Sequence, residues 1–294
     1  MTGISDEAPA VTNTDALTLL SPAKLNLFLH ITGRRPDGYH LLETVFQLLD
    51  YGDELRFQHR NDGMINLSPA IPGVAEQDNL IWRAAYRLRE AYGQLEMGAD
   101  ITLLKRLPMG GGLGGGSSNA AITLRALNQL WNLQRSEDEL AALGLKLGAD
   151  VPVFVRARTA YATGVGEILQ AIEMPTQWFA VLTPPIAVPT AKIFSDLTLT
   201  RDTHPCTIRA LADRGWFAQT RNDCEPVVRQ AYPAVNALIE RMQNFAPTRM
   251  TGTGSSVFAM VSSKAEAERI VRDCAGIAQG FVARGINHLP VVSS

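Results

Sequence analysis

The stretch Leu107-Pro-Met-Gly-Gly-Gly-Leu-Gly-Gly-Gly-Ser-Ser-Asn119 contains six glycines in thirteen residues. Without Cβ atoms, such a loop can turn its backbone N–H groups inward and let an anion approach them. The apolar segment 101–104 before it reads as a strand, and apolar residues recur at helical spacing over 120–131. The first N–H groups of a helix lack partners and lie at the positive end of its dipole. Strand, glycine loop and helix together predict a phosphate-binding site.

Two common phosphate-binding patterns fail to describe this loop. Gly111 and Gly116 have the spacing of Gly-x-x-x-x-Gly-Lys-Ser/Thr, but Ser117 stands where the lysine is required. The dinucleotide pattern Gly-x-Gly-x-x-Gly is met, as almost any glycine-rich run would meet it, and the acidic residue expected about 20 positions later is missing. A glycine linker or a close-packed turn is the structural alternative. The position between an apolar strand and an amphipathic helix disfavours the linker.

Length, composition and charge set broad limits. With 294 residues and 46% hydrophobic content, the chain can bury a sizeable core in one large domain or two smaller ones. The net charge of −2 argues against a nucleic-acid partner. The three cysteines lie far apart, which fits a reducing compartment and argues against structural zinc. We expect a cytoplasmic protein without a membrane segment or signal peptide, and a disordered tail over residues 1–16.

The first expected strand runs from Leu17 to Ile31. Its alternation places Leu25, Leu27 and Leu29 on one face, and the other face carries Lys24, Asn26, Phe28 and His30. A lysine and an asparagine in this arrangement either face solvent or point into a site. The pattern alone leaves both interpretations open.

The rest of the chain alternates predicted helices and strands. We expect a helix from Asn79 to Ala91, another after the capping box at Ser136, and a turn at Ala149-Asp-Val-Pro152 that leads into a strand at 153–155. The proline-rich segment 183–189 predicts a boundary between domains 17–183 and 184–294. Helices between strands that can pair antiparallel predict an α+β fold.

Three separated motifs resemble the three signatures of the GHMP small-molecule kinases. They are Pro22-Ala-Lys-Leu-Asn-Leu27, the glycine loop, and Thr251-Gly-Thr-Gly-Ser-Ser256. The strings Arg35-Pro-Asp-Gly-Tyr-His40 and Leu147-Gly-Ala-Asp-Val-Pro-Val-Phe154 are similar to a branch of this family that phosphorylates a cytidyl alcohol. The resemblance runs from about Leu17 almost to the C-terminus and is weakest over 198–217. It implies a two-domain GHMP kinase fold, with an N-terminal α/β domain, a C-terminal α+β sandwich and an active site in the cleft between them.

The resemblance also implies roles for individual residues, with ATP as phosphate donor and Mg²⁺ beside it. Asp150 matches the general base and Lys24 its charge partner. The positions implied for ATP are Pro108, Met109, Gly110, Gly111, Gly112, Leu113, Gly114, Gly115, Gly116, Ser117, Ser118, Asn79 and Lys105. Those implied for the cytidyl alcohol are Asn26, Tyr39, His40, Phe194, Thr253 and Gly254, with the two aromatic rings against the cytosine. Related kinases often hold Mg²⁺ with a loop serine and a glutamate, but the sequence assigns no such glutamate; Glu167 is only a candidate.

The chemistry of phosphoryl transfer agrees with these roles. Positioning and charge stabilisation matter most. A carboxylate near the hydroxyl can accept its proton, and a lysine nearby favours the ionised carboxylate and stabilises charge on the attacking oxygen.

Other functions remain as alternatives. They are another GHMP kinase acting on homoserine, mevalonate or a sugar, a catalytically silent nucleotide-binding module, and an NAD-dependent enzyme. The aromatic ring and histidine of Asp37-Gly-Tyr-His40 suit a flat base, which favours the cytidyl alcohol. We expect a small-molecule kinase that is a monomer or a weak homodimer.

Overall fold

The structure is a computed structural model that describes residues 16–93, 96–208, 211 and 215–289. The tail expected over 1–16 lies outside these residues except for Ala16, which begins the first strand. No helix in the described ranges is long and apolar enough to cross a membrane.

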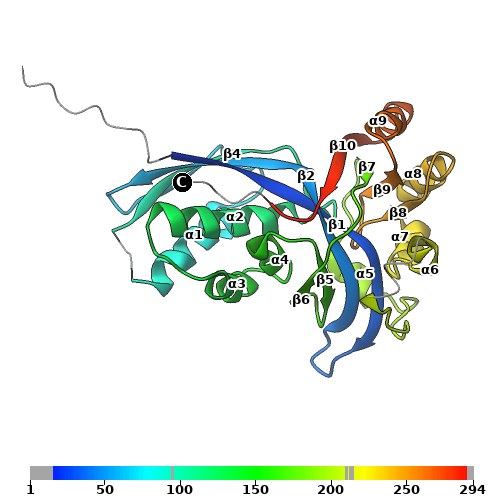
Figure 1. Ribbon diagram of the computed structural model, residues 1–294, viewed down its shortest axis with the longest axis horizontal. Coiled ribbons are helices and arrows are strands. Elements are labelled where there is room, and N and C mark those ends of the chain that lie inside the picture. Colours follow the sequence, from blue (N-terminus) through cyan, green and yellow to red (C-terminus); the bar gives the residue numbers. More distant parts are fainter. Residues whose placement is uncertain (1–15, 94–95, 209–210, 212–214, 290–294) are drawn as a thin grey trace, which may run out of the picture.

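The described strands form one ten-stranded sheet in which neighbours follow the order β3-β4-β2-β10-β7-β9-β8. Outside this path, β1 pairs with β2, and β5 pairs with both β2 and β6. The strands are β1 (Ala16–Arg34), β2 (His40–Arg60), β3 (Ile65–Ser68), β4 (Gly98–Leu104), β5 (Ala160–Thr163), β6 (Ile168–Ala171), β7 (Trp178–Thr183), β8 (Thr248–Met250), β9 (Val257–Val261) and β10 (Gln279–Ile286). Figure 1 shows β1 and β2 as a long ribbon that extends along much of the molecule.

The helices gather toward the two ends of the molecule, α1 to α4 at one end and α6 to α9 at the other (Figure 1). They are α1 (Leu80–Ala91), α2 (Gly115–Leu130), α3 (Glu137–Leu145), α4 (Val151–Arg156), α5 (Thr190–Ser195), α6 (Trp216–Gln219), α7 (Glu225–Ala231), α8 (Pro233–Gln243) and α9 (Lys264–Asp273), with a 3₁₀ turn at Glu76–Asp78. Asn79 caps α1 by accepting the Ile81 N–H at 2.9 Å, and Ser136 and Glu139 form the expected capping box of α3.

Buried apolar side chains make one cluster for each end and a third that joins them. Phe57, Leu88 and Leu124 belong to the first, beneath α1 to α4. The second packs α7 to α9 against β7 and β9. The third contains Leu25 of β1 and Phe258 of β9, residues from opposite halves of the chain. The two halves are therefore held together by apolar burial across their junction.

The predicted domain boundary between residues 183 and 184 stays a prediction. β7, which this boundary assigns to the first domain, pairs with β9 and β10 of the second half. β10 also pairs with β2, so the last strand returns to the first half. One hydrogen-bonded sheet thus runs through both halves.

Two local expectations were wrong. The alternation in β1 is interrupted by irregularities between Pro22 and Lys24 and between Asn26 and Leu29, so Phe28 is buried in the joining cluster with Leu25 and Leu27. The strand expected at 153–155 is part of helix α4. Pro152 is tolerated there because the first turn of a helix needs no N–H from that position.

Candidate active site

A cavity of about 770 Å³ opens where the two halves meet. It is lined from the first half by β1 and the glycine loop, and from the second half by α5 and the loop that follows β8. The predicted site residues that line it are Lys24, Asn26, Tyr39, His40, Gly112, Gly114, Ser117, Asp150, Phe194 and Thr253. Residues far apart in the sequence are thus brought to one cavity between the halves.

Lys24 and Asp150, which both line this cavity, form an ion pair. Lys24 Nζ lies 3.3 Å from Asp150 Oδ2 and also donates to Asn26 Oδ1 at 2.6 Å and to the Gly112 carbonyl at 3.1 Å. The Lys24 side chain is only 5% exposed, whereas that of Asp150 is 33% exposed. Asp150 precedes α4 but makes no capping hydrogen bond with its side chain. Its carboxylate is therefore available to a molecule in the cavity.

Asn26 links the lysine to the second glycine loop. Its side-chain amide donates to Thr44 Oγ1 at 3.0 Å, and its backbone N–H donates to Thr251 Oγ1 at 2.8 Å. The amide therefore presents its oxygen to Lys24. Because Asn26 is also bound by Thr251 of the second half, its contact with Lys24 fixes the Lys24 ammonium group relative to both halves of the chain.

The first glycine loop needs glycine for conformational and steric reasons. Gly112 and Gly114 adopt positive φ values of 77° and 74°. A Cβ atom on Gly114 would lie 2.8 Å from the Phe154 ring, and one on Gly112 would lie 2.6 Å from the Thr251 carbonyl. Gly114 caps α2, whose first N–H groups lie beside the cavity. The geometry is that of an anion site at a helix N-terminus.

Several residues expected to contact ATP do not line the cavity. The Leu113 side chain is in the core, and the buried Ser118 hydroxyl accepts from Ser21 Oγ at 2.8 Å. Asn79 caps α1, and Lys105 pairs with Asp53 at 2.8 Å. The other expected residues outside the cavity lining are Pro108, Met109, Gly110, Gly111, Gly115, Gly116 and Gly254. Their roles toward ATP or substrate stay predictions.

The cavity lining also includes three rings. His40 and Phe194 stack with centroids 5.1 Å apart and an interplanar angle of 26°, while Tyr39 is 64% exposed. Arg201 donates from Nε to His40 Nε2 at 3.0 Å. Burial, followed by the positive charges of Arg201 and Arg34, lowers the pKa of His40 below its usual value.

Sequence reasoning missed Arg201 and Asp53. Arg201 falls in the segment where the resemblance is weakest. Asp53 belongs to no motif, and its contacts with Arg106 and Leu107 span more than fifty residues. Asp53 stands between Gly52 and Glu54, so no local pattern marked it.

Two family descriptions match separate parts of the chain, "GHMP kinases N terminal domain" over residues 79–158 and "GHMP kinases C terminal" over residues 207–276. The chain belongs to the GHMP kinase family and is an ATP-dependent small-molecule kinase. It is similar to proteins named 4-diphosphocytidyl-2-C-methyl-D-erythritol kinase, with 54% identity over 95% of the chain and 96% of the relative from Hahella chejuensis. The relative of that name from Pseudomonas aeruginosa is 53% identical over 92% of the chain and 94% of its own length.

Solved structures agree in fold. The crystal structure of 4-(cytidine 5'-diphospho)-2C-methyl-D-erythritol kinase has a TM-score of 0.79 and 33% identity, covering 92% of this chain and 100% of that one. The homoserine kinase from Cytophaga hutchinsonii has a TM-score of 0.68 at 17% identity, covering 96% of this chain and 98% of that one, which indicates a shared fold alone. The predicted fold class is confirmed.

Proposed function

We propose that the enzyme transfers the γ-phosphoryl group of ATP to the 2-hydroxyl of 4-diphosphocytidyl-2-C-methyl-D-erythritol, a step in the non-mevalonate route to isoprenoid precursors. The observation that carries this proposal is the Lys24–Asp150 pair, placed in one cavity with the glycine loop and the His40–Phe194 stack. The names of the relatives that match nearly the whole chain support the same substrate.

Asp150 is the general base in this proposal. Its partly exposed carboxylate accepts the proton of the attacking hydroxyl. The Lys24 ammonium, held by Asn26 and the Gly112 carbonyl, stabilises the negative charge that develops on that oxygen. Backbone N–H groups at the start of α2 hold the phosphates of ATP.

Mg²⁺ fits the oxygen donors of this cavity. A magnesium ion beside a nucleotide usually takes one or two protein oxygens together with phosphate oxygens. Ser117 lines the cavity at the start of α2 and would supply a protein oxygen. When bound, the ion neutralises charge on the transferred phosphoryl group. Glu167, the candidate glutamate, instead accepts the Val165 N–H of its own turn at 2.6 Å.

The cytidine end is assigned to Tyr39, His40 and Phe194. Phe194 lies against His40 with ring centroids 5.1 Å apart, so the proposed clamp of cytosine between Tyr39 and Phe194 needs the base to lie beside His40, on the part of the Phe194 face that the imidazole leaves uncovered. The exposed Tyr39 ring can cover the second face of the base. His40 then contacts the polar edge of the base, where selectivity arises because a wrong base leaves buried polar groups unpaired.

The alternatives are another GHMP kinase, acting on homoserine, mevalonate or a sugar, and a non-catalytic nucleotide-binding module. Purified protein is incubated with ATP and Mg²⁺ and, in separate reactions, with the cytidyl alcohol, homoserine, mevalonate or galactose. The release of ADP is measured, and the new phosphomonoester is detected by ³¹P NMR. We expect turnover with the cytidyl alcohol. Turnover confined to another alcohol supports the first alternative, and ATP binding without any turnover supports the second.

Replacing the stacking ring tests the assignment of the two ends of the cavity. Phe194→Ala is expected to raise KM for the cytidyl alcohol by about 10-fold, since stacking on an aromatic side chain contributes roughly 1–3 kcal/mol per base. KM for ATP should change less than about twofold, because Phe194 belongs to α5 and not to the glycine loop assigned to ATP. Steady-state kinetics with each substrate varied in turn measures both. A rise in KM for ATP alone would show that the two ends are assigned in reverse.

A further inference from the structure

Arg201 makes a set of contacts that reach beyond its own segment. Besides His40, its guanidinium donates to the backbone carbonyls of Phe194 at 3.2 Å, Asp196 at 2.6 Å and Leu199 at 2.9 Å. It therefore ties together the end of α5, the segment after α5, and the histidine that begins β2. Two of these contacts involve His40 and Phe194, the residues of the ring stack that lines the cavity.

The hydrogen bond to His40 fixes the position of a proton. An arginine side chain has only donors and stays charged, so His40 Nε2 must accept and carry no proton. A neutral imidazole then carries its proton on Nδ1. Nδ1 has no hydrogen-bond partner among the described residues, and His40 lines the cavity. His40 thus offers the cavity a donor.

A hydrogen-bond donor at this position distinguishes cytosine from uracil. Cytosine carries an acceptor at N3 between its amino group and O2, whereas uracil carries an N–H at N3. A donor on Nδ1 pairs with cytosine N3 and repels the N–H of uracil, and the other tautomer has the reverse preference. A polar group on the base edge that is buried without a partner costs more binding free energy than the same group in water, because water would otherwise be its partner.

We propose that Arg201 is a positioning residue that holds His40 in the Nδ1–H tautomer and thereby selects cytosine over uracil. This inference rests on the proposed function, because it takes the cytidyl alcohol as the molecule that reaches His40. Arg201 acts through His40 and touches no reacting atom.

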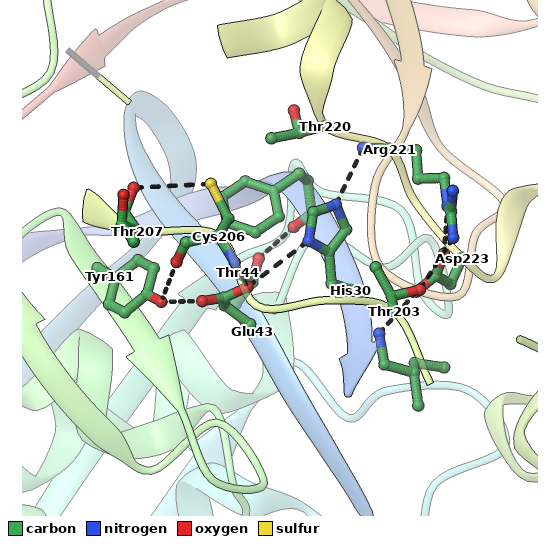
Figure 2. A network of polar contacts seen from close by, with 12 residues as sticks. His30, Glu43, Thr44, Tyr161, Thr203, Cys206, Thr207, Thr220, Arg221 and Asp223 are labelled. Atoms are coloured by element: carbon green, nitrogen blue, oxygen red, sulfur yellow. Dashed lines mark hydrogen bonds and ion pairs between the residues drawn. The ribbon is translucent and has the colours of Figure 1, made fainter. Parts of the chain in front are cut away.

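The segment that carries Arg201 is anchored to β1 and β2 by partly buried polar contacts, several of which Figure 2 shows. Two residues after Arg201, the Thr203 N–H donates to the Ile31 carbonyl at 3.0 Å, and the Thr203 hydroxyl donates to Asp223 at 2.7 Å. Three residues further on, the Cys206 N–H donates to Glu43 at 2.6 Å. Arg201 is therefore held on the same strands that carry Lys24 and His40.

Glu43 is ionised in this anchor. Burial would raise the pKa of Glu43, but the nearby His30 imidazole and hydrogen bonds from the Cys206 N–H and Tyr161 outweigh burial and lower it. The carboxylate is only 3% exposed and also faces His30 Nδ1 at 3.6 Å. A charged acceptor with several donors is a firm attachment for the segment.

The charges that face His40 come from three elements. Arg34 ends β1 and Arg201 follows α5, and both lower the pKa of His40; Asp37, in the loop between β1 and β2, lines the same cavity. Removing the Arg201 charge should therefore raise the pKa of His40, so the variant becomes protonated at a higher pH than the parent. A protonated His40 would carry a proton on both ring nitrogens and would no longer be in the neutral Nδ1–H tautomer.

The first test reads the tautomer directly. Protein labelled with ¹⁵N-histidine is studied by two-bond ¹⁵N–¹H NMR, which reports the ring nitrogen that carries the proton, and the His40 signal is assigned with His40→Gln. We expect Nδ1–H in the parent, a mixture or Nε2–H in Arg201→Met, and recovery of Nδ1–H in Arg201→Lys, which keeps a cationic donor. A parent protein with the proton on Nε2 would overturn the inference without any assay of activity.

The second test measures selectivity. We expect Arg201→Met to lower the ratio of kcat/KM for the cytidyl alcohol to that for its uridine analogue by about tenfold, the effect of one neutral hydrogen bond, with KM for ATP unchanged. Lys192→Ala removes a neighbouring positive charge on α5 outside the cavity lining and should keep the parental ratio.

The two tests separate the inference from the proposed function. If the parent uses the cytidyl alcohol but Arg201→Met keeps the parental ratio, the role of Arg201 is refuted. If the tautomer behaves as expected but the parent does not phosphorylate the cytidyl alcohol, the proposed function fails and the selectivity claim fails with it. Arg201→Met retains an unbranched side chain of similar length, and water can reach the carbonyls that it leaves.

Discussion

Asp150→Asn is expected to lower kcat by about 10²–10⁴-fold while the affinity for ATP stays close to parental. Asparagine has nearly the same shape as aspartate but cannot accept a proton at neutral pH. The Asp150 side chain caps no helix, so the substitution removes no structural hydrogen bond. Single-turnover phosphoryl transfer and calorimetric titration of ATP measure the two quantities.

The Lys24 ammonium group should keep its position in the Asp150→Asn variant. Lys24 Nζ keeps its hydrogen bonds to Asn26 and the Gly112 carbonyl, so the ammonium remains in place when the carboxylate is lost. Asp138→Asn is the matched control, because Asp138 pairs with Arg156 at 2.9 Å on the surface with 83% of its side chain exposed. Its turnover should lie within about twofold of the parent. An Asp150→Asn enzyme with most of its turnover intact would exclude the carboxylate as the base.

The sequence predicted the central strand–loop–helix unit well because its signals are local. Glycine spacing, an apolar strand and helical periodicity all lie within 101–131. The alternation also placed Lys24 and Asn26 on one face, since both residues lie between the first and second irregularities of β1, but it left open whether that face lines a site. Phe28 lies beyond Asn26, where the register shifts, and the alternation assigned its face incorrectly.

The helix α4 was expected as a strand because its apolar run Val153-Phe-Val155 has no period that separates a short buried helix from a buried strand. Arg201 could not be predicted for a different reason. Its contact with His40 spans 161 residues, and no local pattern encodes it. Long-range polar contacts of this kind depend on how the two halves meet, which only the folded chain defines.

Asp53→Asn is expected to destabilise the protein by about 3 kcal/mol and to weaken ATP binding about tenfold. The Asp53 side chain is fully buried, and its carboxylate accepts from the Arg106 and Leu107 N–H groups at 2.8 Å each, from Lys105 Nζ at 2.8 Å, and from Asn119 Nδ2 at 3.0 Å. The asparagine amide keeps the shape of the carboxylate, but its NH2 group would face some of these N–H donors and cannot accept a hydrogen bond from them. Urea unfolding and calorimetric titration of ATP measure the two effects.

The expected loss of ATP affinity follows from where these donors lie. Arg106 and Leu107 begin the glycine loop, and Asn119 lies in the first turns of α2, so one carboxylate fixes both ends of the proposed phosphate site. Glu54→Gln, the adjacent position of β2, is the control, because Glu54 pairs with Arg106 at 3.1 Å but is 42% exposed. A surface pair of this kind contributes about 0–1 kcal/mol, so both measurements should stay near parental. If Asp53→Asn were as stable as Glu54→Gln and bound ATP equally well, the buried carboxylate would not be what holds the loop in place.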